Sequence, residues 1–325
     1  MTASEDELVC SFGCRVVDFA ALIATVNVPI VKSENLLFEL LDSVISGKSA
    51  VSKILIREIP LSIDINIPSA TGDLIIPHLG DLSYLKGLIN FLPQLPQTQI
   101  MVGIDQEISN EMMRIRNSNP DIAFYNFEPH PVGPYVIRNR LIDQSHHHLI
   151  FFQDTDDIPC ADRFDRLAHY MSENNCQFCG SYELRLDEYH REARAIRYPV
   201  NVVNALNAGP HHALLHPSSA ITREAFHLAG KLSEERTFAN DTKFLLRSYF
   251  LVYKIMNIDA FLYIRRKRPG SLTTAPETML GSPARNELLH RWNYDFERIK
   301  RGMMRLEESS LNPVSTALDV RFGKI

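Results

Sequence analysis

The chain has 325 residues, 45% of them hydrophobic and 22% charged. These values are typical of a globular protein and exclude collagen, a coiled coil and a wholly disordered chain. The 34 basic and 39 acidic side chains give a formal net charge of -5, so the chain as a whole lacks the positive charge typical of proteins that bind nucleic acids.

The first segment, residues 1–68, differs in pattern from the rest, with a helical stretch at 34–45 and a proline-punctuated passage at 60–68. Its first ten residues are acidic and lack the positive start and apolar core of a secretory signal. The longest apolar-rich stretch, 19–31, is interrupted by Asn27 and Pro29 and is shorter than the roughly 20 residues that span a bilayer. Five cysteines are an odd number in a long chain, which indicates reduced thiols. We therefore expect an N-terminal extension on a soluble cytoplasmic protein.

From residue 74 onward, short β-rich runs alternate with longer amphipathic segments, which predicts an α/β fold with a mostly parallel sheet flanked by helices. The predicted strands are 74–76, 100–104, 123–126, 149–152, 178–186 and 251–256, and the clearest helices are 83–91 and 163–171. This Rossmann-like alternation predicts one domain over residues 69–283. Residues 284–325 are predicted to form a helical tail, with a charged amphipathic helix or helix pair at 285–308.

The most informative segment is the apolar run 149–152, which ends in three carboxylates at Asp154, Asp156 and Asp157. A buried strand of this kind delivers acids to the carboxyl edge of a sheet, where open α/β folds bind ligands. Residues i and i+2 of an extended backbone face the same side, so Asp154 and Asp156 can converge on one ligand. Clustered carboxylates repel unless a cation neutralises them, and oxygen ligands suit Mg²⁺ or Mn²⁺. The alternative is that Asp156 or Asp157 only caps the following helix.

The segment around these acids resembles the metal-binding motif of the family-two glycosyltransferases with the GT-A fold, a hydrophobic strand followed by DxD or DxDD. The resemblance covers residues 74–273, with the elements of that family in order. The matching segments are 74–78 (LIIPH), 83–88 (SYLKGL), 100–105 (IMVGID), 133–139 (GPYVIRN), 216–226 (HPSSAITREAF), 238–247 (FANDTKFLLR) and 266–273 (RKRPGSLT).

The resemblance implies a role for particular residues. Asp154 and Asp156 are expected to bind the metal, Asp105 to recognise the nucleotide base, and Asp241 to act as the catalytic base. The other expected contacts to the nucleotide of the donor are Pro77, His78, Gly133 and Arg138, together with Asp154 itself. Contacts to the diphosphate or the acceptor are expected from His216, Arg266 and Arg268.

The sequence departs from the family pattern at several of these positions. Asn240 replaces the Glu that usually precedes the base, and Ile104 stands where a first Asp is common. Ile137 replaces the usual Ala. Arg268 replaces a His that serves as a metal ligand in some relatives, and a guanidinium cannot ligate a cation. We expect Arg266 or Arg268 to neutralise the diphosphate instead.

These observations predict an inverting glycosyltransferase that uses a UDP-sugar and Mn²⁺ or Mg²⁺. A divalent ion stabilises the departing diphosphate, and one carboxylate, Asp241, removes the proton of an acceptor hydroxyl on a glycan or glycolipid. A single displacement inverts the anomeric centre. Basic side chains at Arg298, Lys300, Arg301 and Arg305 allow peripheral contact with the inner face of an anionic membrane, against the alternative of a plain surface helix.

Two other classes of protein are compatible with the same residues. A haloacid-dehalogenase-like phosphohydrolase also places Asp-x-Asp after a strand, with the first Asp as nucleophile, but its motif usually opens the core and has Thr or Val where Ile158 stands. A catalytically silent GT-A module that binds a sugar nucleotide or a partner is the second, and the Asn240 departure supports it. For Asp241, the alternative to a catalytic role is that it only caps the helix that follows. Turnover of a nucleotide sugar separates these alternatives.

Overall fold

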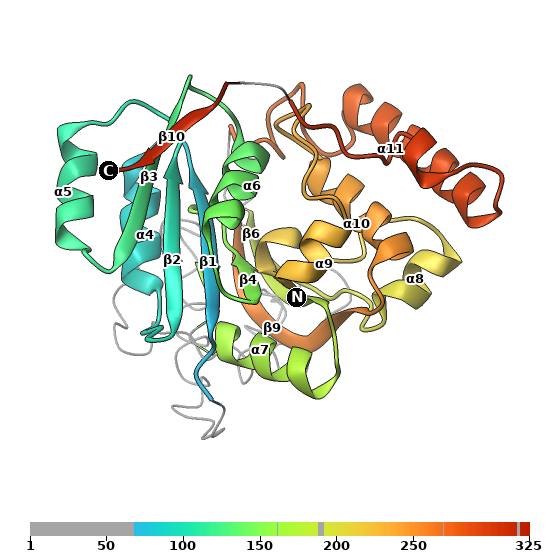
Figure 1. The fold of residues 1–325 in the computed structure, drawn as a ribbon, viewed down its shortest axis with the longest axis horizontal. Helices are drawn as coiled ribbons and strands as arrows, with labels where there is room; N and C mark the ends of the chain where they lie inside the picture. Colours follow the sequence, from blue (N-terminus) through green and yellow to red (C-terminus); the bar gives the residue numbers. More distant parts are fainter. Residues whose placement is uncertain (1–67, 161, 188–191, 269, 317–318) are drawn as a thin grey trace, which may run out of the picture.

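The computed structural model describes residues 68–325, except for 161, 188–191, 269 and 317–318. The helix predicted at 34–45 lies outside these residues. The described part is built on a ten-stranded sheet with the order β10-β3-β2-β1-β4-β8-β6-β9-β5, in which β7 pairs with β6 (Figure 1). The fold is therefore α/β around a single mixed sheet, in which the adjacent strands β3, β2, β1 and β4 run parallel to one another.

The parallel half of the sheet contains β1 (Gly72–His78), β2 (Thr98–Ile104), β3 (Ile122–Glu128) and β4 (Leu149–Phe152). Strands β1 and β4 are completely buried, which explains their continuous apolar sequences. The order β3-β2-β1-β4 is that of a Rossmann-like half. The carboxyl ends of these strands consequently meet at one edge of the sheet.

The other half of the sheet contains β5 (Ile158–Pro159), β6 (Phe178–Asp187), β7 (Glu192–Ile196), β8 (Ala220–Thr222) and β9 (Ile255–Lys267). Strand β8 pairs antiparallel with both β4 and β6, whereas β6 and β9 are parallel. The strand predicted at 251–256 is wrong in its first part, because α10 (Asn240–Leu251) continues to Leu251 and β9 begins only at Ile255.

Helices cover both faces of the sheet and define two hydrophobic clusters. One cluster packs α4 (Leu82–Phe91), α5 (Asn110–Ser118) and α7 (Arg163–Glu173) on one face. The other packs α6 (Pro134–Gln144), α8 (Val202–Ala208), α9 (Arg223–Leu228), α10 and α11 (Pro283–Lys300) on the opposite face. Short 3-10 turns occur at His216–Ser218 and Leu306–Glu308. Among the described helices, none is long and apolar enough to cross a membrane.

Helix α6 packs on β2 at a point where the strand carries a glycine. A Cβ atom added at Gly103 would be 2.3 Å from Ile137 Cγ2 and 2.9 Å from Phe127 Cε2. A side chain at position 103 would therefore require the side chains of Ile137 and Phe127 to move. The bulky Ile137, which departs from the Ala typical of the family resemblance, is therefore accommodated by the missing side chain at position 103.

The region predicted as a helical tail also contributes to the sheet. After α11, the chain returns as β10 (Arg321–Lys324), which pairs antiparallel with β3 (Figure 1). The ring of Phe322 stacks on that of Phe127, with centroids 5.2 Å apart. Residues 284–325 thus combine a helix with an edge strand and are packed on the main domain.

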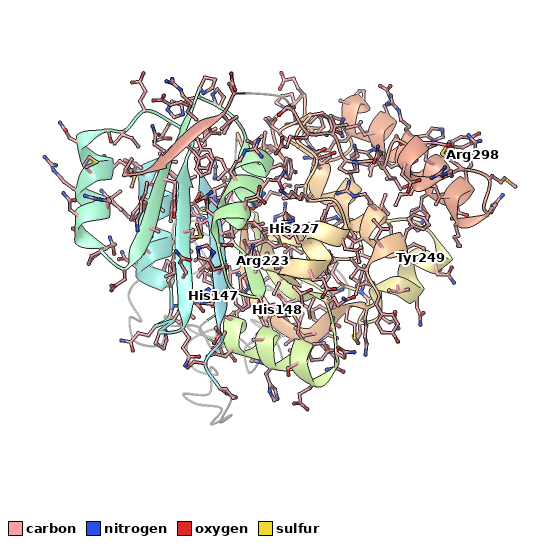
Figure 2. All side chains as sticks on the ribbon, viewed as in Figure 1. His147, His148, Arg223, His227, Tyr249 and Arg298 are labelled. Carbon is pink, nitrogen blue, oxygen red and sulfur yellow. The ribbon has the colours of Figure 1, made fainter. Side chains whose placement is uncertain are left out.

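The amino end of β1 is held by a buried carboxylate, at the opposite end of the strand from the candidate site. The side chain of Asp73 is fully buried, and it accepts hydrogen bonds from the backbone N–H of His147 at 2.9 Å and from Arg223 Nη2 at 3.0 Å. His147 Nδ1 lies 2.8 Å from the other oxygen of Asp73. Figure 2 labels His147 and Arg223, which belong to the segment before β4 and to α9. This contact fixes the relative positions of β1, β4 and α9.

Candidate active site

The three acids that follow β4 form one cluster at the carboxyl edge of the sheet. Oxygen atoms of Asp154, Asp156 and Asp157 all lie within 4.8 Å of one another. Neither Asp156 nor Asp157 caps a helix, because the residues that follow form β5 and the N-cap of α7 is Asp162. The capping alternative for this cluster is therefore wrong.

The three acids differ in how many of their oxygens are already engaged. Asp157 is buried, and it accepts hydrogen bonds from Tyr263 OH at 2.8 Å and from the backbone N–H of Arg266 at 2.7 Å, one on each oxygen. Asp154 Oδ1 accepts from Arg138 Nη2, and Asp156 Oδ2 accepts from Arg268 Nε at 2.7 Å. Asp154 Oδ2 and Asp156 Oδ1 receive no hydrogen bond from any described residue. Asp157 is consequently a structural acid, whereas Asp154 and Asp156 each retain an available oxygen.

The cluster is electrostatically costly by itself. Burial raises the pKa of Asp154, and the charge of Asp156 adds to this rise, which the guanidinium of Arg138 opposes. Burial likewise raises the pKa of Asp157 well above its usual value, and the charges of Asp156 and Asp154 act in the same direction. A divalent cation would remove this repulsion. The two available carboxylate oxygens and the partly exposed Asp154 and Asp156 side chains, 35% and 20% exposed, fit Mn²⁺ or Mg²⁺.

Positive side chains from β9 lie next to the acids. The guanidinium groups of Arg266 and Arg268 lie over the ring of Tyr84, at 5.0 and 4.8 Å from its centroid. Tyr84 belongs to α4, which follows β1. The two arginines thus bring positive charge from the far half of the sheet to the edge where the acids lie. This places both predicted diphosphate contacts, Arg266 and Arg268, at the acid cluster.

Helix α6 connects the acid cluster with the end of β2. The carboxylate of Asp105 is buried, and its two oxygens accept the backbone N–H groups of Val132 at 2.7 Å and Gly133 at 2.8 Å. Gly133 is the N-cap of α6, with φ at +89°, and Asp105 supplies the negative charge that a helix start favours. Burial raises the pKa of Asp105 in spite of these hydrogen bonds. Asp105 therefore positions α6, and recognition of a base by Asp105 remains a prediction.

One face of α6 reaches two carboxylates at once. Arg138 donates to Asp154, and Tyr135, one turn earlier on the helix, donates from its hydroxyl to Asp241 Oδ1 at 3.3 Å. Residues three apart on a helix share a face. Sequence reasoning missed Tyr135, although it lies within the 133–139 segment. The helix therefore links the acid cluster to the predicted base.

Asp241 lies in the first turn of α10, but it does not cap the helix. The N-cap is Ala239, at φ +62°, and no side chain forms a capping hydrogen bond there. The simple capping role for Asp241 is therefore wrong. Burial acts to raise the pKa of Asp241, but the nearby His212 and the backbone N–H of Thr242 act against it, and the pKa is lowered. The carboxylate is consequently ionised at neutral pH, as a general base must be.

The residue before the predicted base has a structural role. Asn240 is fully buried, and its side-chain Nδ2 donates to the carbonyl oxygens of Ser233 at 2.7 Å and Arg236 at 2.9 Å. Its Oδ1 accepts from Arg236 Nη2 at 3.0 Å. All of these contacts go to the loop that leads into α10. Asn240, which departs from the family pattern, therefore fixes the backbone that presents Asp241.

Two buried histidines lie at the same edge. His78, next to Pro77 at the end of β1, has its Nδ1 3.3 Å from Thr155 Oγ1, and burial lowers its pKa to about 4. His216 packs against the ring of Phe152, with centroids 4.1 Å apart, and burial lowers its pKa to about 3. Both ring nitrogens of His216 are buried and receive no hydrogen bond from a described residue. Both imidazoles are therefore neutral at physiological pH.

A buried arginine that the sequence did not suggest supports the acid-bearing loop. The side chain of Arg163 is completely buried and donates to Gln153 Oε1 at 2.5 Å, to the carbonyl of Phe152 at 2.6 Å and to that of Pro217 at 3.0 Å. These bonds join the end of β4 to the turn after His216. Arg163 therefore fixes the backbone immediately before Asp154, and no local motif announces such a role.

Comparisons with solved structures agree with this architecture. TarS 1-349 from S. aureus in complex with UDP-GlcNAc superposes with a TM-score of 0.54 and 16% identity, over 73% of this chain and 77% of that chain. The mannosyltransferase PcManGT from Pyrobaculum calidifontis, in complex with GDP-Man and Mn²⁺, superposes with a TM-score of 0.52 and 11% identity, over 88% of this chain and 76% of that chain. Both are GT-A-type glycosyltransferases. The chain has the GT-A fold. A scan against protein-family models and a search of curated proteins each found no match.

The GT-A fold agrees with the class predicted from the sequence. In the present structure, the acid cluster, His78, Asp105 and Arg138 lie at the carboxyl edge of the parallel half of the sheet. Sequence identities of 11% and 16% to the two structures relate the chains by fold, and the roles of single residues depend on the geometry described above.

Proposed function

We propose that this protein is an inverting glycosyltransferase that transfers a sugar from a UDP-sugar to a hydroxyl group of a glycan or glycolipid. The observation that carries the proposal is the connection made by α6. The helix pairs Arg138 with Asp154 in the acid cluster and Tyr135 with Asp241. A site for a diphosphate and a site for a base are thereby held side by side on one rigid element, as a transfer reaction requires.

In this mechanism, Asp154 and Asp156 would hold Mn²⁺ or Mg²⁺ through their available oxygens. The bound ion would stabilise the negative charge of the departing nucleoside diphosphate, so that no acidic side chain is required for the leaving group. Arg266 and Arg268 add positive charge at the same place. Arg138 orients Asp154, and Asp157 remains engaged by Tyr263.

Asp241 accepts the proton of the acceptor hydroxyl while the oxygen attacks the anomeric carbon. The attack comes from the face opposite the diphosphate. The bond between the anomeric carbon and the diphosphate oxygen breaks as the new C–O bond forms, the nucleoside diphosphate leaves, and the configuration inverts. The lowered pKa of Asp241 keeps it ionised for this step. Tyr135 orients the carboxylate through its hydroxyl group, and His212, whose Nδ1 lies 3.5 Å from Thr242 Oγ1, lies at the acceptor side.

Support for a sugar nucleotide comes from the two structures of the same fold, of which one holds UDP-GlcNAc and the other GDP-Man with Mn²⁺. We assign the nucleotide as UDP, the base being recognised by Asp105 near the start of α6. His78, Pro77 and Gly133 complete the nucleotide pocket, and His216 borders the acceptor side. The basic residues at the end of α11 and beyond it, Arg298, Lys300, Arg301 and Arg305, provide peripheral contact with an anionic membrane on the cytoplasmic side.

The experiment that tests the proposal is a donor screen on the purified chain. UDP and GDP, each with Mn²⁺ or with EDTA, are compared for binding by calorimetry, and the matching sugar nucleotides are then compared for turnover. UDP binding that requires the metal, followed by release of UDP from one UDP-sugar, supports the proposal. Binding without turnover of any donor with any hydroxyl acceptor would indicate the silent module instead. Absence of binding by either nucleotide would reject the proposal.

A further inference from the structure

A pocket lies between α10, α11 and the segment that follows the 3-10 turn at Leu306–Glu308. Its volume is about 360 Å³, within the range of small-molecule sites. It is lined by residues that none of the steps above uses, chiefly Glu235, Arg236, Lys243, Arg291, Trp292 and Ser310. The pocket is therefore separate from the acid cluster.

The charges around the pocket are unequal. Three cations, Arg236, Lys243 and Arg291, line it, and Glu235 is the one carboxylate among its lining residues. Glu287 lies 3.7 Å from Arg291, so three cations stand against two carboxylates and the excess is one positive charge. Lys243 is buried, with 3% of its side chain exposed, and donates to Glu235 Oε1 at 2.9 Å. Asp295, behind the wall, accepts the backbone N–H of Ser310. A buried cation next to an excess of positive charge favours an anionic ligand.

Three polar atoms of the lining residues are buried behind the pocket surface and have no hydrogen-bond partner among the described residues. They are Glu235 Oε2, Arg236 Nε and Ser310 Oγ. An unsatisfied buried polar atom costs about 1–3 kcal/mol, so these groups would gain a hydrogen bond if a small side-chain movement turned them toward a ligand in the pocket. One water occupies about 30 Å³, which is far less than the volume of this pocket.

The types of these atoms define the ligand further. Arg236 Nε is a donor that needs an anionic or neutral acceptor, whereas Glu235 Oε2 is an acceptor that needs a hydroxyl donor. Ser310 Oγ can donate or accept. A phosphate group satisfies Arg236 and Arg291, because guanidinium groups bind phosphate oxygens well, and a carboxylate such as Glu235 accepts from adjacent hydroxyl groups. We propose that the pocket between α10 and α11 binds a small phosphorylated sugar or polyol.

This pocket shares two residues, Glu235 and Arg236, with the loop that presents Asp241. Arg236 donates from Nη2 to Glu235 Oε1 at 2.6 Å and to Asn240 Oδ1 at 3.0 Å, while its guanidinium lies over the ring of Trp292 at 5.3 Å. The binding proposal itself is independent of any reaction at the acid cluster. It is tested by binding alone.

The test uses glucose 6-phosphate as the probe, with glucose and inorganic phosphate as its separate parts, and isothermal titration calorimetry on the full chain. We expect glucose 6-phosphate to bind, inorganic phosphate to bind more weakly, and glucose to show no measurable binding. No binding of either phosphate probe at about 10 mM, or equal binding of glucose and glucose 6-phosphate, overturns the proposal. Saturating UDP with Mn²⁺ should leave the binding unchanged, and displacement by UDP would place the phosphate at the acid cluster and reject the pocket.

A matched pair of variants on α11 and its C-cap locates the site. Arg291 lines the pocket, and Arg301 does not; both are largely exposed (58% and 65%), and each lies 3.7 Å from a glutamate four residues earlier. Arg291→Gln should weaken glucose 6-phosphate binding by roughly three- to tenfold, whereas Arg301→Gln should leave it within about twofold. Equal effects of the two variants would show that only general charge matters and would overturn the proposal.

Ser310→Ala gives an independent check that does not depend on charge. The Ser310 hydroxyl has no partner among the described residues, so its removal should leave the free energy of unfolding unchanged or slightly higher in the absence of ligand. The same variant should weaken glucose 6-phosphate binding by roughly three- to tenfold. Loss of stability without loss of affinity would show that the hydroxyl serves the fold, and would contradict the proposal.

Discussion

Substitution of Asp241 by Asn separates a catalytic base from a structural acid. The change keeps the size of the side chain and an oxygen that accepts from Tyr135, but it removes the ability to take up a proton. General base catalysis contributes about 10²- to 10⁴-fold, so kcat should fall by that factor with the donor identified in the screen. UDP affinity in the presence of Mn²⁺ should remain within about threefold, because Asp241 is not in the acid cluster.

The structure sets the expected cost to stability. No capping bond is lost, because the N-cap is Ala239. What is lost is one negative charge in the first turn of α10, which contributes about 0.3–1 kcal/mol through the helix dipole. The melting temperature should therefore fall by no more than roughly 4 °C. The variant can be compared with wild type as a folded protein under the same assay conditions.

Asp121→Asn is the matched control, because Asp121 is exposed and lies in the turn before β3, at the opposite end of the strand from the candidate site. It should have wild-type kcat and UDP affinity. Near-normal turnover by Asp241→Asn would refute the base assignment and leave the transferase proposal intact. A parallel loss of UDP affinity would instead show that Asp241 helps to organise the diphosphate site.

Three further predictions concern the same edge of the sheet. Asp156→Ala should abolish the Mn²⁺-dependent part of UDP binding in calorimetry, and unchanged affinity would reject the metal assignment. Arg163→Met should lower the free energy of unfolding in urea by roughly 3 kcal/mol, since it leaves three buried oxygens without their donor; a change below about 1 kcal/mol would contradict that role. Because the pKa of His216 falls from 6.5 to about 3, the unfolded state takes up a proton below pH 6.5 that the folded state does not. Between pH 7 and 5, wild type should therefore lose roughly 2 kcal/mol more stability than His216→Phe, and equal losses would contradict this pKa.

The parallel half of the sheet could be predicted from sequence because its strands are short, apolar and followed by polar residues. The predicted strand 149–152 has the observed bounds of β4, and 74–76, 100–104 and 123–126 lie within β1, β2 and β3. The strand predicted at 251–256 was partly wrong because the apolar end of a helix is followed closely by the apolar start of a strand. Short apolar runs have no period that distinguishes a helix from a strand. Strand β10 was missed because its sequence, RFGK, has one large apolar residue, and its pairing with β3 is set by tertiary structure.

The acid cluster could be predicted because its members are neighbours in the sequence, whereas their partners could not. Arg268 is 112 residues from Asp156, and Tyr263 is 106 residues from Asp157. Only the return of β9 beside β6 brings these residues to the end of β4. The link between Tyr135 and Asp241, 106 residues apart, has the same origin. Sequence spacing therefore identified the acids, and the fold determines which of their oxygens remain available.

The short strand β10 also decides how the sheet ends. Without it, the seven-residue strand β3 would expose a row of free backbone N–H and C=O groups to other chains, which is a common route to aggregation. With it, the outermost strand has four residues, two of them the charged Arg321 and Lys324, and three of the four are exposed. Charged and very short edge strands are poor templates for pairing. Variants that unpair β10 from β3 should therefore aggregate before they lose the acid cluster that follows β4.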